Sequence, residues 1–145
     1  MSFENLTPTW NDRPLTDPGF AADVVDLMVT LGDRQKGSIT AIVCGPDDRF
    51  LTAMAVELRP DFAGLAATEL FRTALRPVLE ALRTSPDAGL VVALGRPDHD
   101  LLAAMDHAWA QAATEVCEAA GVRLLGFYVA TKLGIHQPAA GRVLI

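Results

Sequence analysis

Residues 89–94 read Gly-Leu-Val-Val-Ala-Leu, and this short, wholly apolar stretch decides the fold. A strand that is covered on both faces shows a continuous apolar run instead of an alternation of polar and apolar residues. The stretch follows a breaker sequence, residues 84–87 (Thr-Ser-Pro-Asp), and it ends in a polar loop at 95–100. Residues 89–94 are therefore expected to form a buried strand in a sheet with helices on both sides.

The sequence on both sides of this strand shows helical patterns followed by strand patterns. Before it, apolar residues at helical spacing predict a long amphipathic helix over 63–82, with Pro77 kinking it or splitting it in two. After it, an alanine-rich helix is expected over 101–120 and a further strand over 123–130. The tail beyond residue 130 reads as a loop, apart from a possible short strand at 142–145.

The N-terminal third predicts one helix and one hairpin. Thr16 and Asp17 precede Pro18, which is the usual order of an N-cap and a first-turn proline, and the helical run that starts there is expected to stop at Gly32. Residues 33–37 then read as a polar turn. Two runs of strand-forming residues follow, and the turn cluster between them indicates a hairpin of strands 38–44 and 50–58.

The expected order of elements is α-β-β-α-β-α-β. This order predicts an α/β fold, a three-layer α-β-α sandwich around a mixed sheet. Residues 1–16 carry prolines and polar residues without a period, so they are interpreted as an N-terminal arm. Residues 17–145 are interpreted as a single domain, since a chain of 145 residues leaves little room for a second one.

The amino-acid composition argues against some classes of binding partner. The 12 Lys and Arg residues stand against 18 Asp and Glu, a net charge of −6, whereas proteins that bind nucleic acid through its phosphates carry basic patches. The sequence has no apolar run near the roughly 20 residues that span a bilayer, and its N-terminus does not resemble a signal peptide. Cys44 and Cys117 lie far apart in apolar stretches and are expected to be reduced. We therefore expect a cytoplasmic protein without a membrane or nucleic-acid partner.

The densest group of ionisable side chains follows the central strand. Arg96, Asp98, His99 and Asp100 lie in the loop at its carboxyl end. Ligands of open α/β sheets bind in the crevice outside these strand ends, so the four residues form a candidate ligand-binding loop. Two structural interpretations stand beside this one: Asp98 or Asp100 could cap the following helix, and Arg96 could pair with an acidic side chain instead of binding an anion.

A metal-dependent site can be assembled from the same neighbourhood. Asp106 and His107 follow the loop, and with His99 they offer oxygen and imidazole ligands of the kind that bind zinc, iron or manganese. Glu57, at the end of the second strand, could join them as a catalytic carboxylate. Against this, neighbouring helical residues diverge by about 100°, so Asp106 and His107 do not easily face one site. The alternation around Glu57 is also typical of a solvent-facing strand residue.

Several stretches resemble the JAB/MPN domain, in the version found in bacterial RadC-like proteins. Residues 68–75 (TELFRTAL) resemble the helix that precedes the family's metal-binding strand, and residues 89–97 resemble that strand and its exit. Residues 106–129 resemble the next helix and strand, so the similarity covers roughly residues 20–130. The resemblance implies a JAB/MPN- or cytidine-deaminase-like three-layer fold, which agrees with the order of elements derived above.

The resemblance also implies a zinc site, and this chain departs from it. Members with peptidase activity hold zinc with a His-x-His pair and an aspartate, and an upstream glutamate acts as general acid/base. Asp106 and Glu57 are the counterparts of the two acidic residues, but residues 93–96 (Ala-Leu-Gly-Arg) supply no histidine in either possible register. The resemblance therefore implies a degenerate, metal-free member without a catalytic residue or cofactor, which acts through protein–protein contact.

Three hypotheses of function follow. The first is a non-catalytic JAB/MPN-like domain that forms a homodimer, because the two alanine-rich helices could leave apolar faces for a second copy and two-fold dimers are the commonest oligomers. The second is a metal-dependent hydrolase with zinc in a rearranged site, with Glu57 and Asp106 as catalytic residues and His99, Asp106 and His107 as ligands. The third is a small-ligand binding domain that uses Arg96 and the strand-exit loop.

Overall fold

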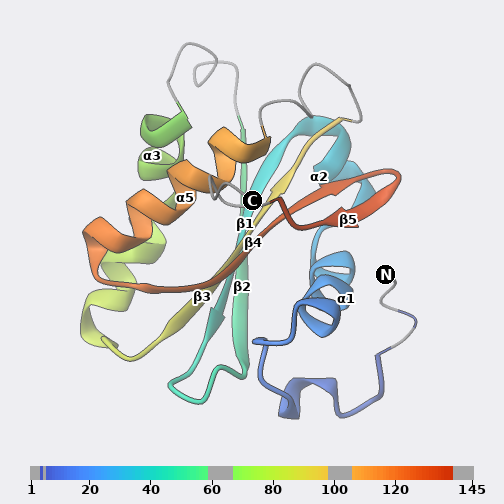
Figure 1. Cartoon of the computed structure of the whole chain (residues 1–145), viewed down its shortest axis with the longest axis horizontal. Helices are drawn as coiled ribbons and strands as arrows, with labels where there is room; N and C mark the ends of the chain where they lie inside the picture. The colour runs from blue at the N-terminus through green and yellow to red at the C-terminus, as the bar shows by residue number, and fades with distance from the viewer. Residues whose placement is uncertain (1–3, 5, 59–66, 98–105, 139–145) are drawn as a thin grey trace, which may run out of the picture.

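A computed structural model describes residues 4, 6–58, 67–97 and 106–138 (Figure 1). Within these residues, five strands form one mixed sheet in the order β2-β1-β3-β4-β5. The strands are β1 (Ser38–Cys44), β2 (Phe50–Glu57), β3 (Gly89–Gly95), β4 (Arg123–Thr131) and β5 (Gly134–His136). Strand β3 pairs antiparallel with β1 and parallel with β4, and the outer pairs β1–β2 and β4–β5 are both antiparallel.

Helices cover both faces of this sheet. Helices α1 (Pro18–Met28) and α2 (Leu31–Lys36) lie on one face, and α3 (Ala67–Ala81) and α5 (Asp106–Ala120) lie on the other (Figure 1). Two short 3-10 helices, η2 (Trp10–Asp12) and η4 (Leu82–Thr84), complete the described elements. The predicted three-layer α-β-α sandwich with a mixed sheet is confirmed.

The central strand owes its composition to these two layers. All residues of β3 are buried. Leu90, Val92 and Leu94 pack into the hydrophobic core beneath α3 and α5, and Val91 and Ala93 pack into the core beneath α1. Alternate side chains of a strand point to opposite faces, so a strand with a core on each side must be apolar at every position.

Helix α2 corrects one sequence prediction. Residues 31–36 were expected to end a helix and start a polar turn, but α1 ends at Met28 and a second helix begins after Thr30. The Thr30 side chain accepts a hydrogen bond from the Asp33 backbone N–H at 3.1 Å and so caps the new helix. The Thr-x-x-Asp spacing is a known signal for a helix start, and the apolar period of α1 obscured it.

Helix α3 and strand β5 correct two more predictions. Of the two alternatives for Pro77, a kink or a split, the split is wrong, because α3 is one continuous helix from Ala67 to Ala81. Pro77 is exposed, while Leu75 and Val78 beside it are buried in the core, and this packing outweighs the one backbone hydrogen bond that proline removes. Residues 134–136 were expected to be loop but pair with β4 through a two-residue turn. The expected helical residues 63–66 and 101–105 and the possible strand 142–145 lie outside the described residues.

The described part of the N-terminal arm packs against the hairpin of β1 and β2. The Leu15 side chain is buried in the core beneath α1, and its backbone N–H donates to the Asp48 carbonyl at 2.8 Å. The Trp10 ring lies 5.1 Å from the Phe50 ring, between centroids. The arm thus covers the end of the sheet where the hairpin turns.

The two cysteines are free thiols on opposite faces of the sheet. Cys44 belongs to the core beneath α1, and Cys117 belongs to the core beneath α3 and α5. Burial raises the pKa of the Cys44 thiol to about 12 and that of Cys117 to about 11. Thiols with such raised pKa values are weak nucleophiles, so both cysteines are core residues.

A buried arginine ties the α1–α2 layer to the sheet. The Arg34 guanidinium donates to the backbone carbonyls of Val29 at 3.0 Å, Thr131 at 3.1 Å and Asp26 at 3.1 Å. It also donates to the Asp26 carboxylate at 2.9 Å. One side chain therefore holds together the end of α1, helix α2 and the end of β4.

We predict that Arg34→Met lowers the free energy of unfolding by about 3 kcal/mol, because it removes four hydrogen bonds to buried or partly buried acceptors, three of which are backbone carbonyls. The matched control is Arg72→Met, which removes an exposed pair with Glu69 at 2.8 Å and should cost less than about 1 kcal/mol. Urea unfolding of both variants measures the difference. Equal losses in the two variants would show that the Arg34 network does not hold the layer.

Candidate functional site

Two charged side chains, Arg96 and Asp106, meet at the carboxyl end of β3. Arg96 follows β3 directly and Asp106 lies in the first turn of α5. The Arg96 guanidinium donates from Nε to Asp106 Oδ1 at 3.1 Å and from Nη2 to Asp106 Oδ2 at 2.8 Å. The exposed fractions of the two side chains are only 6% and 7%, so this is a bidentate, buried ion pair.

The fold determines this pairing. The backbone N–H of Arg96 donates to the Ala130 carbonyl at 3.1 Å, which carries the parallel β3–β4 pairing one residue beyond the strand. The side chain of Arg96 continues the alternation of Leu94 and so points to the face that carries α5. Its third nitrogen, Nη1, donates to the Pro97 carbonyl at 3.1 Å.

His136 is the third member of the cluster. Its Nε2 lies 2.8 Å from Asp106 Oδ2, and its side chain is half exposed. An ionised carboxylate only accepts hydrogen bonds, so Nε2 carries the proton here and Nδ1 is the second ring nitrogen. Strand β5 holds the histidine in place because His136 pairs with Val129.

The chemistry of this Arg96–Asp106–His136 cluster is limited. A carboxylate that orients an imidazole is the arrangement that activates a hydroxyl or thiol nucleophile in hydrolases. Across the described ranges, no Ser, Thr or Cys side chain is hydrogen-bonded to His136. Among the described residues, the cluster therefore shows no nucleophile.

The structure does not bring Glu57 and Asp106 together. Val56 packs into the core beneath α3 and α5, so its neighbour Glu57 points to the opposite face of the sheet, where it is exposed. Asp106 belongs to α5 and lies on the face that Val56 occupies. The alternation of side chains along β2 therefore places the two carboxylates of the proposed hydrolase site on opposite faces of the sheet.

The remaining candidates are dispersed or lie elsewhere. His107 is exposed on α5, while the adjacent Asp106 is buried, as expected from their divergence around the helix. Asp98, His99 and Asp100, with the predicted helix cap among them, lie outside the described residues. Arg96 pairs with an acidic side chain, one of the two alternatives that the sequence left open.

Asp106 does not offer a fitting zinc ligand. Both of its carboxylate oxygens accept hydrogen bonds from Arg96. A tetrahedral zinc site needs three or four protein ligand atoms that are free to bind the metal. In the part of the chain that the structure describes, no three His, Cys, Asp or Glu side chains are grouped so that they could hold a metal ion. Asp106 and His136 alone are too few ligands for such a site.

His136 was absent from the candidates that the sequence analysis produced. The residues around it carry no strand pattern, and its approach to Asp106 depends on the hairpin at Lys132 and Leu133. The contact spans 30 positions in sequence. The sequence indicated a site in this region only because Arg96 and Asp106 follow the end of a strand.

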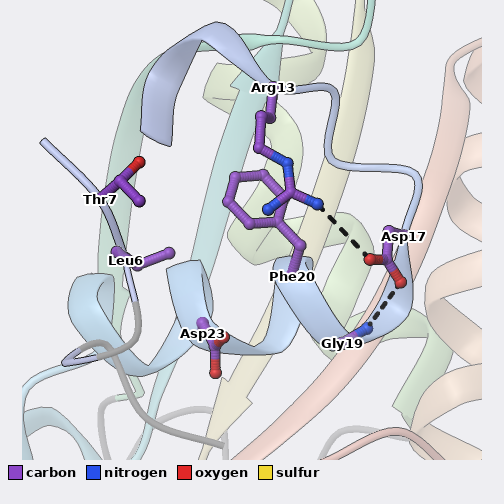
Figure 2. A pocket seen from close by; sticks show the side chains of 7 residues that line it. All are labelled: Leu6, Thr7, Arg13, Asp17, Gly19, Phe20 and Asp23. Carbon is purple, nitrogen blue, oxygen red and sulfur yellow. Dashed lines mark hydrogen bonds and ion pairs between the residues drawn. The ribbon is translucent and has the colours of Figure 1, made fainter. Parts of the chain in front are cut away.

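A separate cavity of about 410 Å³ lies between the arm and the start of α1, at the hairpin end of the molecule (Figure 2). Its lining residues are Leu6, Thr7, Arg13, Asp17, Gly19, Phe20 and Asp23. A volume in this range accommodates small ligands. The cavity is far along the strands from the Arg96–Asp106–His136 cluster, since the arm packs beside Phe50 and Asp48 while Arg96 follows the opposite end of β3.

The charged groups of this cavity interact with one another. The Arg13 guanidinium lies 4.1 Å above the centre of the Phe20 ring and 3.7 Å from the Asp17 carboxylate (Figure 2). Asp17 Oδ1 also accepts the Gly19 backbone N–H at 3.2 Å, which confirms the predicted cap of α1. Asp17 thus has a structural role, and the cavity contains no unpaired buried charge that would select a ligand.

Comparison of the chain with models of known protein families, with functionally characterised proteins and with solved structures finds no significant match. The resemblance to JAB/MPN domains thus remains a prediction. Over the residues that the structure describes, none of the helices combines the length and apolar character needed to cross a membrane.

We predict that the Arg96–Asp106 pair behaves as a single unit. Arg96→Met and Asp106→Leu should each lower the free energy of unfolding by about 3 kcal/mol, because each leaves a buried charge without its partner. The double variant should lose less than the sum of the two, and a double-mutant cycle in urea measures the coupling. Additive losses would contradict a buried pair. His136→Ala, which changes a half-exposed partner, is the control and should cost less than about 1 kcal/mol.

Proposed function

We propose that this protein is a non-catalytic, metal-free domain similar to the JAB/MPN fold and that it acts through protein–protein contact as a homodimer. The observation that carries the proposal is the Arg96–Asp106 ion pair. By the resemblance, Asp106 stands at the position of the family's metal-binding aspartate. In this chain, the positive charge beside the Asp106 carboxylate comes from an arginine of the same chain.

The guanidinium excludes a metal for an electrostatic reason. Arginine stays protonated at any pH at which proteins are folded, so it cannot lose its charge to make room for a cation. A divalent ion beside Asp106 would have to displace two hydrogen bonds and tolerate the repulsion of a buried positive charge. The position of Glu57 on the other face of the sheet also weighs against the alternative of a metal-dependent hydrolase.

Two further features support the rest of the proposal. Cys44 and Cys117 are free and buried, which fits a reducing, cytoplasmic compartment. The net charge of −6 does not favour a nucleic-acid partner. We propose contact with protein as the way in which this domain acts, with a second copy of the chain as the partner, because two-fold dimers are the commonest soluble oligomers.

We predict that the protein purified without chelator contains far less than one zinc per chain, and that an equimolar addition of zinc leaves its melting temperature unchanged. Elemental analysis and a thermal scan measure these two quantities. About one bound zinc per chain, lost in Asp106→Asn or in His99→Ala, would overturn the metal-free assignment.

We also predict that the protein sediments as a dimer. Sedimentation equilibrium at micromolar concentration should give about twice the 15.5 kDa mass of one chain. The interface of this dimer is expected to bury more than about 1,000 Å² in total. A single species at the mass of one chain would rule out the homodimer.

A further inference from the structure

We propose that the outer edge of β2 is the surface through which two copies of this chain pair, strand to strand, about a two-fold axis at Met54. This inference rests on the proposed homodimer and specifies its interface. It follows from the hydrogen-bonding direction of β2, from its composition and from its self-complementarity.

Within the described residues, no strand pairs with the outer side of β2, so its backbone presents unpaired groups at the edge of the sheet. The Leu58 N–H donates to the Gly37 carbonyl of the neighbouring β1 chain segment at 3.0 Å, so residue 58 faces inward. Backbone N–H and C=O groups of alternate residues point to opposite edges of an antiparallel strand. Ala53, Ala55 and Glu57 therefore direct their N–H and C=O groups away from β1, toward the free edge.

Within the described residues, most of this edge lacks the features that normally prevent pairing. Soluble proteins protect edge strands with charged residues, prolines, bulges, a covering segment or short length. Residues 50–56 contain neither a charged residue nor a proline, and Leu51 and Met54 are 64% and 45% exposed. A register shift that leaves Leu51 without a partner in β1, and a single bridge between Pro14 and Arg49, lie at one end of β2. The stretch from Leu51 to Glu57 is left exposed or half-exposed.

The other edge of the sheet is different. Strand β5 has only three residues, and a short edge strand offers few unpaired groups. Strand β2 has eight residues. The sheet thus has one protected edge and one edge suited to receive another strand.

A second copy is the occupant that this edge fits. Met54 is the midpoint of the free stretch, and an antiparallel two-fold pair about it places Ala53 opposite the partner's Ala55 and Leu51 opposite the partner's Glu57. Outward-facing residues then meet outward-facing residues, so their N–H and C=O groups can be exchanged. Chains with a net charge of −6 repel each other, but within residues 51–57 this register places no like charges face to face. The contact is closed, because each copy uses the same edge.

The test uses charge reversal at the axis. Met54 would face its own copy in a non-hydrogen-bonded pair, where Cα atoms are about 4.5 Å apart and the side chains touch. Met54→Lys and Met54→Glu should each sediment at the mass of one chain, because like charges meet at the axis. An equal mixture of the two should recover a species of twice that mass, because the charges are then opposite.

Two more variants complete the design. Ala55→Pro removes an outward N–H that has no partner in β1, so it should keep the fold and abolish the dimer. Leu133→Lys changes the most exposed large apolar residue, 78% exposed in the turn between β4 and β5, and should leave the dimer intact. Far-UV circular dichroism and cooperative urea unfolding establish that each variant is folded.

The outcomes separate the two proposals. If the wild-type chain is a dimer and the Met54 variants remain dimers, or the mixture of the two stays at the mass of one chain, the β2 interface is wrong and the homodimer stands. If the wild-type chain has the mass of one chain, both are wrong, and an extended segment of another protein becomes the candidate for this edge. Loss of the dimer in the two charge variants, with recovery on mixing, supports the β2 interface.

Discussion

The burial of β3 on both faces is the constraint on which the rest of this structure depends. All its residues are buried, so its backbone groups have to be satisfied by a strand on each side. On one side β1 follows an antiparallel course, and on the other β4 runs parallel. A parallel neighbour needs a crossover connection, and the described part of that connection is α5. Because the helix returns over the sheet, its first turn lies at the carboxyl end of β3.

This geometry explains why the Arg96–Asp106 pair exists. Arg96 is the first charged residue after an apolar strand, and its backbone still pairs with β4, so its side chain remains in the protein interior. A buried guanidinium requires an acceptor with a matching charge, and the first turn of α5 supplies Asp106. Breaking the pair is costly even though such pairs add little net stability. The pair gives the Asp106 carboxylate a positively charged partner within the same chain.

The two edge strands of the sheet differ in length and in what lies beside them. The β4 side ends in a short strand, and the buried Arg34 ties the end of β4 to α1 and α2. The β2 side ends in an eight-residue strand with an apolar sequence, and the arm reaches only its first residues.

The sequence by itself determined the features that depend on local patterns. The bounds of β1 agree with the prediction, β3 is buried on both faces, Asp17 caps α1, and the three layers follow from the order of elements. These features depend on side-chain period and on capping, which act within a few residues. Only the tertiary structure decided that His136 meets Asp106, and that Glu57 faces away from both. Those relations depend on strand pairing and on the parity of a neighbouring strand across the sheet, and a one-residue change in register would reverse them.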